Sequence, residues 1–179
     1  WAGACNQMDE IWVPSDFNLH TFAAAGVDPA RLVKIPGGIA AEQFDIHAAP
    51  LDVPGRRAFN FLSVFDWQLR KGWDRLLAAF ITEFGPESDA SLTLKVWSSC
   101  GQTMAQIRAE AAGYLRAAGL AREVPPNVIF LAGHLPAAQL PSLYRAADAF
   151  VLPTHGEGWG RPYMEAMAMG LPVIGTRWS

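Results

Sequence analysis

The stretch HGEGWGRPYMEAM, residues 155–167, lies between two short apolar runs. The run AFVLP (149–153) before it has the length of a buried strand, and PVIGT (172–176) after it is a second run of this kind. The stretch is therefore predicted to leave a strand as a loop and then begin a helix. Pro162 stands where the first helical residue is expected, because its missing N–H would have no partner there.

The same loop carries groups that suit a phosphate and sugar hydroxyls. Gly156, Gly158 and Gly160 leave the backbone bare and free to adopt positive φ angles. The start of the helix directs unpaired N–H groups and the positive end of its dipole into the loop, which favours an anion. Glu157 and Glu165 add hydrogen-bond acceptors. Glycine and glutamate also occur in such loops for turn and capping reasons alone, so this alternative stays open.

Composition predicts an ordinary globular protein with a hydrophobic core. Of the 179 residues, 51% are hydrophobic and 17% are charged, and the net charge of −3 gives no reason to expect nucleic acid as a partner. Cys5 and Cys100 are isolated, which favours buried thiols and a reducing, cytoplasmic location. No apolar run reaches membrane-spanning length, and no signal peptide is evident. The full-length protein could still lie at the membrane periphery.

Strand and helix patterns alternate along the chain. Five strands are predicted at residues 59–65, 91–97, 127–133, 149–153 and 172–176. Helices are predicted from about 72 to 84, from 103 to 118, from 137 to 147 and after the glycine-rich loop. Upstream, a helix capped by Ser15 is predicted between strands at 10–14 and 32–36. Short, continuously apolar strands indicate an α/β fold, with a Rossmann-like parallel sheet and helices on both faces.

Three domain segments are predicted. Residues 47–57, HAAPLDVPGRR, hold two prolines and a glycine with little periodicity, which is typical of a linker. We therefore expect residues 1–48 to end one domain, residues 49–57 to connect, and residues 58–179 to form a second domain. Because the chain starts at Trp1 and stops after an apolar run, we expect it to be a fragment that lacks the final elements of this domain.

Two further loops are expected at the same edge of the sheet, where ligands bind in open parallel sheets. DWQLRKG (66–72) offers Arg70 and Lys71, which could bind a diphosphate, although a solvated basic pair is the alternative. AGHLP (132–136) could hydrogen-bond a nucleobase through its backbone, and His134 in it could equally be structural.

The residues GEGWGRPYMEAMAMGLPVIGT (156–176) resemble the signature of retaining, nucleotide-sugar-dependent glycosyltransferases of the GT-B fold, of the group 1 or family 4 type. In that family two glutamates are separated by seven residues, as Glu157 and Glu165 are here. The resemblance extends to residues 143–154, 61–80 and 13–39, and so covers nearly the whole chain. It implies that residues 58–179 form the donor-binding, C-terminal half of such an enzyme.

The resemblance also assigns roles to single residues. Glu165 would accept hydrogen bonds from the ribose, and Glu157 would lie near hydroxyls of the donor sugar without acting as a nucleophile. The backbone expected to approach the sugar and phosphates is that of Gly158, Trp159 and Gly160. Lys71 matches the diphosphate-binding lysine of the family, so Lys71 and Glu157 are the catalytic candidates.

One departure from the family pattern concerns the second positive charge. Many relatives have an arginine five positions before the lysine, whereas this chain has Asp66. Arg70 or Arg161 would then have to supply that charge. The sequence offers no acidic cluster for a metal, so we expect a metal-independent reaction with no cofactor besides the nucleotide-sugar substrate.

The predicted function is transfer of a glycosyl group, of the hexosyltransferase type, from a nucleotide-diphosphate sugar to an unknown glycan, lipid or small-molecule acceptor. The isolated fragment is expected to bind the donor poorly and to be inactive. A non-catalytic nucleotide-sugar-sensing half, or an epimerase or phosphorylase of the same fold, remains an alternative. A nicotinamide enzyme and a P-loop enzyme are excluded because their glycine motifs are absent.

Overall fold

The computed structural model describes residues 1–131 and 133–177. The chain divides into two compact units, Trp1–Ile39 and the residues from Ala40 onward. The first unit holds two short parallel strands, β1 (Ile11–Val13) and β2 (Leu32–Lys34), with helices α1 (Ala2–Cys5) and α2 (Asp16–Ala24). As predicted, Ser15 caps α2, its hydroxyl accepting a hydrogen bond from the backbone N–H of Asn18 at 3.3 Å.

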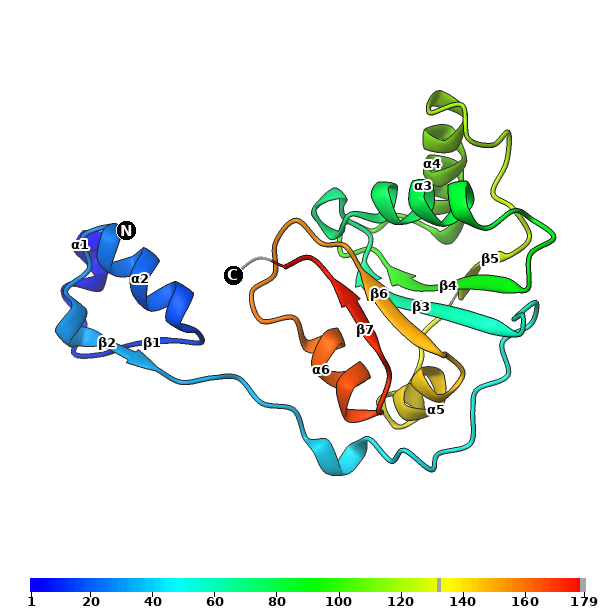
Figure 1. The fold of residues 1–179 in the computed structure, drawn as a ribbon. Coiled ribbons are helices and arrows are strands. Elements are labelled where there is room, and N and C mark those ends of the chain that lie inside the picture. Colours follow the sequence, from blue (N-terminus) through cyan, green and yellow to red (C-terminus); the bar gives the residue numbers. More distant parts are fainter. Residues whose placement is uncertain (132, 178–179) are drawn as a thin grey trace. The chain divides into compact units, whose positions relative to one another are not determined.

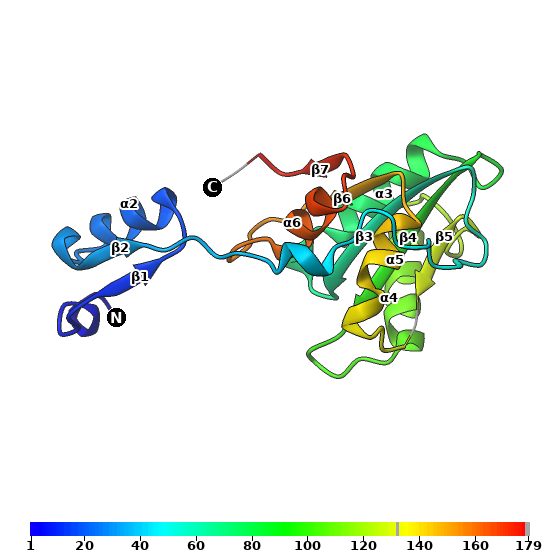
Figure 2. The ribbon, with the colours of Figure 1, turned by 90° about the horizontal axis from the view of Figure 1, so that it is seen from below.

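The second unit is a five-stranded parallel sheet covered by helices. Its strands are β3 (Phe59–Asp66), β4 (Ala90–Trp97), β5 (Val128–Leu131), β6 (Ala149–Leu152) and β7 (Val173–Gly175). They pair in the order β5-β4-β3-β6-β7, so β5 and β7 form the edges (Figures 1 and 2). The strand order reverses between β3 and β6, which is where a ligand crevice is expected in a doubly wound sheet.

Helices cover both faces of this sheet. They are α3 (Trp73–Glu83), α4 (Met104–Ala117), α5 (Leu140–Arg145) and α6 (Arg161–Ala168). Figure 1 shows α3 and α4 on one face and α5 and α6 on the other. The predicted α/β fold class, with a Rossmann-like parallel sheet, is therefore confirmed.

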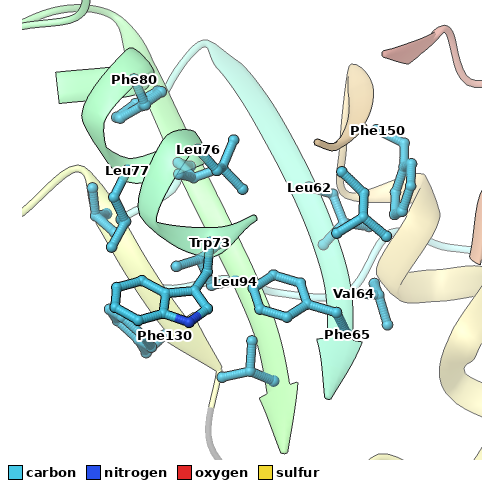
Figure 3. Close-up of a cluster of buried hydrophobic side chains, with 14 of the residues drawn as sticks. Leu62, Val64, Phe65, Trp73, Leu76, Leu77, Phe80, Leu94, Phe130 and Phe150 are labelled. Carbon is cyan, nitrogen blue, oxygen red and sulfur yellow. The ribbon is translucent and has the colours of Figure 1, made fainter. Parts of the chain in front are cut away.

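The core lies mainly between α3 and the central strands. Trp73, Leu76, Leu77 and Phe80 are buried on one face of α3, which packs over β3 and β4 (Figure 3). This spacing is the amphipathic period that predicted the helix. Phe84 caps the end of α3 and is only partly buried against the same cluster.

Two helix starts differ from the sequence prediction. The helix expected over residues 137–147 begins as a 3-10 turn, Ala137–Gln139, and α5 proper starts at Leu140 and ends at Arg145. Pro141 explains the break, because it has no N–H to continue the hydrogen bonds of the turn before it. Helix α6 begins at Arg161, so Pro162 is its second residue and still needs no N–H partner.

The boundary between the units lies before the predicted linker. Residues 47–57 contain neither helix nor strand, as expected. They nevertheless pack on the second unit: the N–H of Leu51 donates to the Ser142 carbonyl at 2.7 Å, and the Arg56 guanidinium donates to the Ala146 carbonyl at 3.1 Å. Proline and glycine in this segment prevent regular structure, but these bonds tie it down, and the two compact units divide between Ile39 and Ala40.

Composition led to expectations about membrane-spanning helices and about the two cysteines. Among the described helices, none combines the length and the apolar composition that crossing a membrane requires. Cys5 and Cys100 are both free thiols. The expectation that both are buried is wrong: Cys5 is partly exposed and Cys100 is exposed, because it lies in the loop after β4 and not in a strand.

Candidate functional site

A cavity of about 650 Å³ opens at the carboxyl ends of the strands. Its floor comes from the ends of β3 and β4, and its walls come from the loop after β5 and the loop that joins β6 to α6. The predicted site residues that line it are Lys71, Glu157, Glu165, Arg70, Trp159, Gly160, Arg161 and His134. Gly158, which was also predicted, is not among the lining residues.

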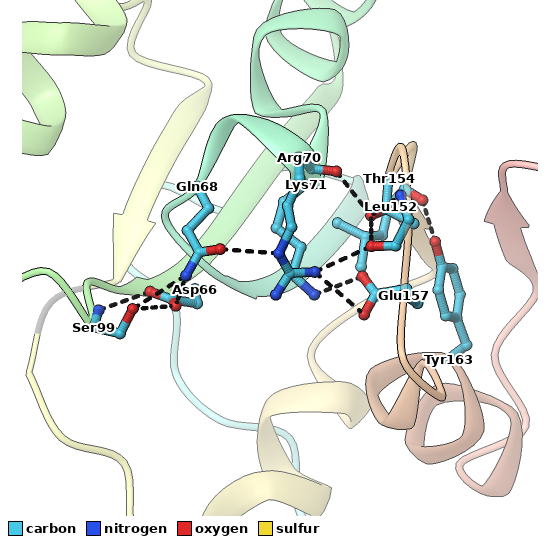
Figure 4. A network of polar contacts seen from close by, with 10 residues as sticks. Asp66, Gln68, Arg70, Lys71, Ser99, Leu152, Thr154, Glu157 and Tyr163 are labelled. Atoms are coloured by element: carbon cyan, nitrogen blue, oxygen red, sulfur yellow. Dashed lines mark hydrogen bonds and ion pairs between the residues drawn. The ribbon is translucent and has the colours of Figure 1, made fainter. Parts of the chain in front are cut away.

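Lys71 and Glu157 meet directly in this cavity. The ammonium of Lys71, a residue only 6% exposed, donates to Oε1 of Glu157 at 2.5 Å (Figure 4). The two residues are 86 positions apart in the chain. Lys71 ends the 3-10 turn Leu69–Lys71 that follows β3, and Glu157 lies in the loop that follows β6. The adjacency of β3 and β6 in the sheet therefore brings the two charges together.

Arg70 holds the two loops against each other. Its carbonyl accepts hydrogen bonds from the N–H of His155 at 2.7 Å and from the hydroxyl of Thr154 at 2.9 Å. Its guanidinium donates to the Gly156 carbonyl at 3.1 Å and lies 3.9 Å from Oε2 of Glu157 (Figure 4). The half-exposed side chain of Arg70 thus adds positive charge at the mouth of the cavity.

The carboxylate of Glu165 is held in place by a hydrogen bond from α5. It is only 9% exposed, and Oε2 accepts a hydrogen bond from the hydroxyl of Tyr144 at 2.8 Å. Burial raises the pKa of Tyr144, and the negative charge and hydrogen bond of Glu165 raise it further, so the hydroxyl stays protonated and donates. The nearest cation to Oε1 is the exposed Arg161, whose Nε lies 4.0 Å away. Oε1 is therefore the oxygen of Glu165 that is left for a ligand.

The glycine-rich loop enters α6 through a residue with a positive φ angle. Gly160 is the N-cap of α6 with φ of 75°, and a Cβ atom there would lie 2.8 Å from the ring of Tyr163. The helix N-terminus has no side-chain cap. Nearby, the indole N–H of Trp159 is buried without a hydrogen-bond partner among the described residues. The loop therefore presents unpaired donors beside the cavity.

The base-binding loop predicted at residues 132–136 is only partly described. His134 lines the cavity after β5, together with Gly133 and Leu135. Ala132, the first residue of this loop, lies outside the described residues.

Lys95 also lines the cavity and was not among the predicted site residues. This residue lies near the end of β4, is 9% exposed, and its ammonium donates to the Gly133 carbonyl in the cavity wall. Burial lowers the pKa of Lys95. Lys95 is the one charged residue of the strand SLTLKVW, and this was the signal that could have found it.

Asp66, where the resemblance led us to expect an arginine, is a structural acceptor at the end of β3. Its carboxylate accepts hydrogen bonds from the N–H and hydroxyl of Ser99 at 2.8 and 2.6 Å, and from Gln68 (Figure 4). Burial alone would raise the pKa of Asp66, but these hydrogen bonds outweigh it and the pKa is lowered. The group is therefore a carboxylate that joins the loops after β3 and β4.

Proteins of known name share parts of this sequence. The chain is 26% identical over 168 residues to a D-inositol 3-phosphate glycosyltransferase of Segniliparus rotundus, covering 88% of this chain and 34% of that protein. It is 33% identical over 106 residues to mannosylfructose-phosphate synthase of Agrobacterium fabrum, covering 59% of this chain and 22% of that protein. The chain thus spans about a third or less of the length of these relatives.

Solved structures show the same fold. Sucrose-phosphate synthase of Thermosynechococcus elongatus superposes with a TM-score of 0.74 at 24% identity, over 98% of this chain and 42% of that chain. HepE of Anabaena, solved in complex with UDP and glucose, gives a TM-score of 0.73 at 17% identity, over 98% of this chain and 46% of that chain. Both structures have the GT-B fold, which agrees with the strand order found here.

The decisive match is to a protein family. The profile described as glycosyl transferases group 1 matches residues 56–179, which include the whole sheet and every residue of the cavity. The cavity at the strand-order reversal, with its facing lysine and glutamates, thus lies wholly within the matched region. The chain belongs to the group 1 glycosyltransferase family.

Proposed function

We propose that the protein transfers a glycosyl group from a nucleotide-diphosphate sugar to an acceptor with retention of anomeric configuration, and that this chain supplies the donor-binding wall. The observation that carries the proposal is the meeting of Lys71, Glu157 and Glu165 in one cavity at the strand-order reversal. The complex of HepE with UDP and glucose supports a nucleotide sugar as the ligand class.

Lys71 has the main chemical role in this proposal. Departure of a nucleoside diphosphate from an anomeric carbon develops negative charge on the phosphates, and a preorganised cation lowers that barrier. Lys71 is held in place by Glu157, and Arg70 lies at the mouth of the same cavity. These cations and the start of α6 would supply the positive charge without a metal ion.

The two glutamates have separate roles. Glu165, positioned by Tyr144, would accept hydrogen bonds from the ribose hydroxyls through Oε1. Glu157 would accept hydrogen bonds from the donor sugar while it keeps Lys71 oriented. Neither glutamate is assigned as a nucleophile.

The test is product formation by the full-length protein. It is incubated with a panel of nucleotide sugars and with glycan, lipid and small-molecule acceptors, and released nucleoside diphosphate is measured. Proton NMR of the product then reports whether the anomeric configuration is retained. Donor-dependent thermal stabilisation without any release would favour the non-catalytic alternative. The absence of both stabilisation and release would contradict the proposal.

Tyr144→Phe is expected to weaken binding of a nucleoside diphosphate by about tenfold, because a hydrogen bond to a charged group contributes roughly 1.5–3 kcal/mol. The change removes the donor that orients Glu165 without removing the ring from the core. Isothermal titration calorimetry measures the affinity. Tyr114→Phe is the matched control, because Tyr114 is a partly buried ring that packs on Trp73 outside the cavity. Equal affinities in both variants would contradict the role given to Tyr144.

A further inference from the structure

Lys95 has a positive charge that the site does not neutralise. In the part of the chain that the structure describes, no carboxylate lies at ion-pair distance from its ammonium. The other lysine and arginines that line the cavity do have such partners: Lys71 and Arg70 lie beside Glu157, and Arg161 lies beside Glu165. Lys95 therefore differs from every other lysine and arginine described in the cavity wall.

The surroundings of Lys95 leave hydrogen-bond donors for a ligand. An ammonium group has three N–H donors, and the only protein acceptor found for it among the described residues is the Gly133 carbonyl. A nearly buried donor without a partner is costly, and so is a nearly buried charge. The lowered pKa of Lys95 reflects this cost. Acceptor atoms of a ligand would relieve it.

The position of Lys95 identifies the part of the ligand that it would meet. Leu94 packs beneath α3 (Figure 3), so Lys95, the next residue of β4, points to the opposite face, which α5 and α6 cover. There the loop after β5 lines the cavity with Gly133, His134 and Leu135. This end offers backbone, an aliphatic side chain and an imidazole ring, which suits a flat base.

The phosphate-binding groups lie at the other end of the cavity. Lys71 and Glu157 follow β3 and β6, whereas Gly133 follows β5. From β5, β3 is two strand spacings away and β6 is three, which corresponds to roughly 10 Å and 14 Å at the usual strand spacing. A diphosphate held by Lys71 and a ribose held by Glu165 would thus leave the base as the part of the nucleotide nearest to Lys95.

We propose that Lys95 recognises the nucleobase: its ammonium donates to the oxo group at C4 of uracil or thymine or at C6 of guanine, so the site selects donors with these bases over donors with cytosine or adenine, which carry an amino group at that position. The inference rests on the proposed function. An oxo oxygen accepts hydrogen bonds, and two of the three N–H donors of Lys95 have no acceptor among the described residues. The amino group of adenine or cytosine in the same place would direct N–H bonds at a positive charge.

The experiment compares the affinities of the full-length protein for UDP, TDP, GDP, ADP, CDP and inorganic pyrophosphate by isothermal titration calorimetry. The native protein is expected to bind at least one of UDP, TDP and GDP about tenfold or more tightly than it binds ADP and CDP. Lys95→Met, which removes the charge at similar volume, should abolish this preference, and it should weaken pyrophosphate less than it weakens UDP, TDP or GDP, because pyrophosphate loses only the longer-range attraction. Lys95→Arg, which keeps the charge and donors, should retain part of the preference. Thermal unfolding of each variant checks that it is folded.

Each other outcome overturns a specific statement. If Lys95→Met weakens all nucleotides and pyrophosphate equally, Lys95 contacts the phosphates and the base assignment fails. If the native protein binds ADP or CDP as tightly as UDP, TDP and GDP, the base assignment fails while the proposed function stands. The same holds if Lys95→Met keeps the native preference. If the native protein binds no nucleotide at all, the proposed function itself fails, and the role of Lys95 fails with it.

Discussion

Lys71→Ala is expected to lower turnover of a nucleotide sugar by the full-length protein by about 100-fold or more, which is the scale of losing one preorganised group that stabilises developing charge. Lys71 is the most buried of the lysines and arginines described in the cavity wall, and Glu157 holds its ammonium in one place. The phosphates gain negative charge only as the glycosidic bond breaks. The loss should therefore appear mainly in kcat, measured from the initial rate of nucleoside diphosphate release.

Lys34→Ala provides the matched control for Lys71→Ala. Lys34 lies in the first unit, is well exposed, and pairs with Asp16 at 2.7 Å. Exposed ion pairs contribute little to stability, so turnover should stay within about twofold of the native value. Thermal unfolding checks that Lys71→Ala is folded, because the change leaves Glu157 without its closest partner. A rise in KM with an unchanged kcat would mean that Lys71 only binds the ground state.

The strands of the second unit could be predicted because their burial is visible in the sequence. β4 is buried at every position except Trp97, although SLTLKVW alternates, with Leu92, Leu94 and Val96 on one face and Ser91, Thr93 and Lys95 on the other. The glycine-rich loop was equally readable, since strand, loop and helix follow one another without interruption. The pairing of Lys71 with Glu157 was not visible as a contact, because it depends on β3 lying beside β6 in the sheet.

Other features were hidden because the sequence does not show which neighbours a residue meets. In the sequence, Lys95 is only a charged residue within a core strand. Its role becomes visible when the structure shows that it donates to the Gly133 carbonyl and lines the cavity. In the sequence, Tyr144 looks like a core residue of its helix. Its hydrogen bond to Glu165 could not be predicted, because it joins two different helices. Asp66 occupies the expected position of an arginine, yet its role is set by Ser99 in a loop 33 residues away. The packing of residues 51–57 on the sheet unit was also hidden, since the hydrogen bonds of Leu51, Arg56 and Arg57 leave no pattern in the sequence.

Gly72→Ala is expected to cost about 3 kcal/mol or more of unfolding free energy, a loss at the upper end of what single substitutions produce. Gly72 has φ of 69° and separates the 3-10 turn of Lys71 from α3. A Cβ atom there would lie 2.0 Å from the carbonyl oxygen of Pro153. A side chain at this φ costs roughly 1–2 kcal/mol by itself. The clash adds to this cost, because the atom in the way is backbone that cannot rotate aside.

The matched control for this prediction is Gly119→Ala. Gly119 has nearly the same φ, 68°, but no heavy atom lies within 4 Å of the position that a Cβ atom would take there. The control therefore carries the backbone strain alone, and the difference between the two variants measures how closely the loop after β3 must approach the loop after β6. Thermal unfolding should show a fall in Tm of roughly 6–12 °C for Gly72→Ala and a smaller fall, about 2–8 °C, for Gly119→Ala. Equal falls would mean that the close approach at Pro153 is not needed, and the contact that aligns Lys71 with Glu157 would then have to come from Arg70 alone.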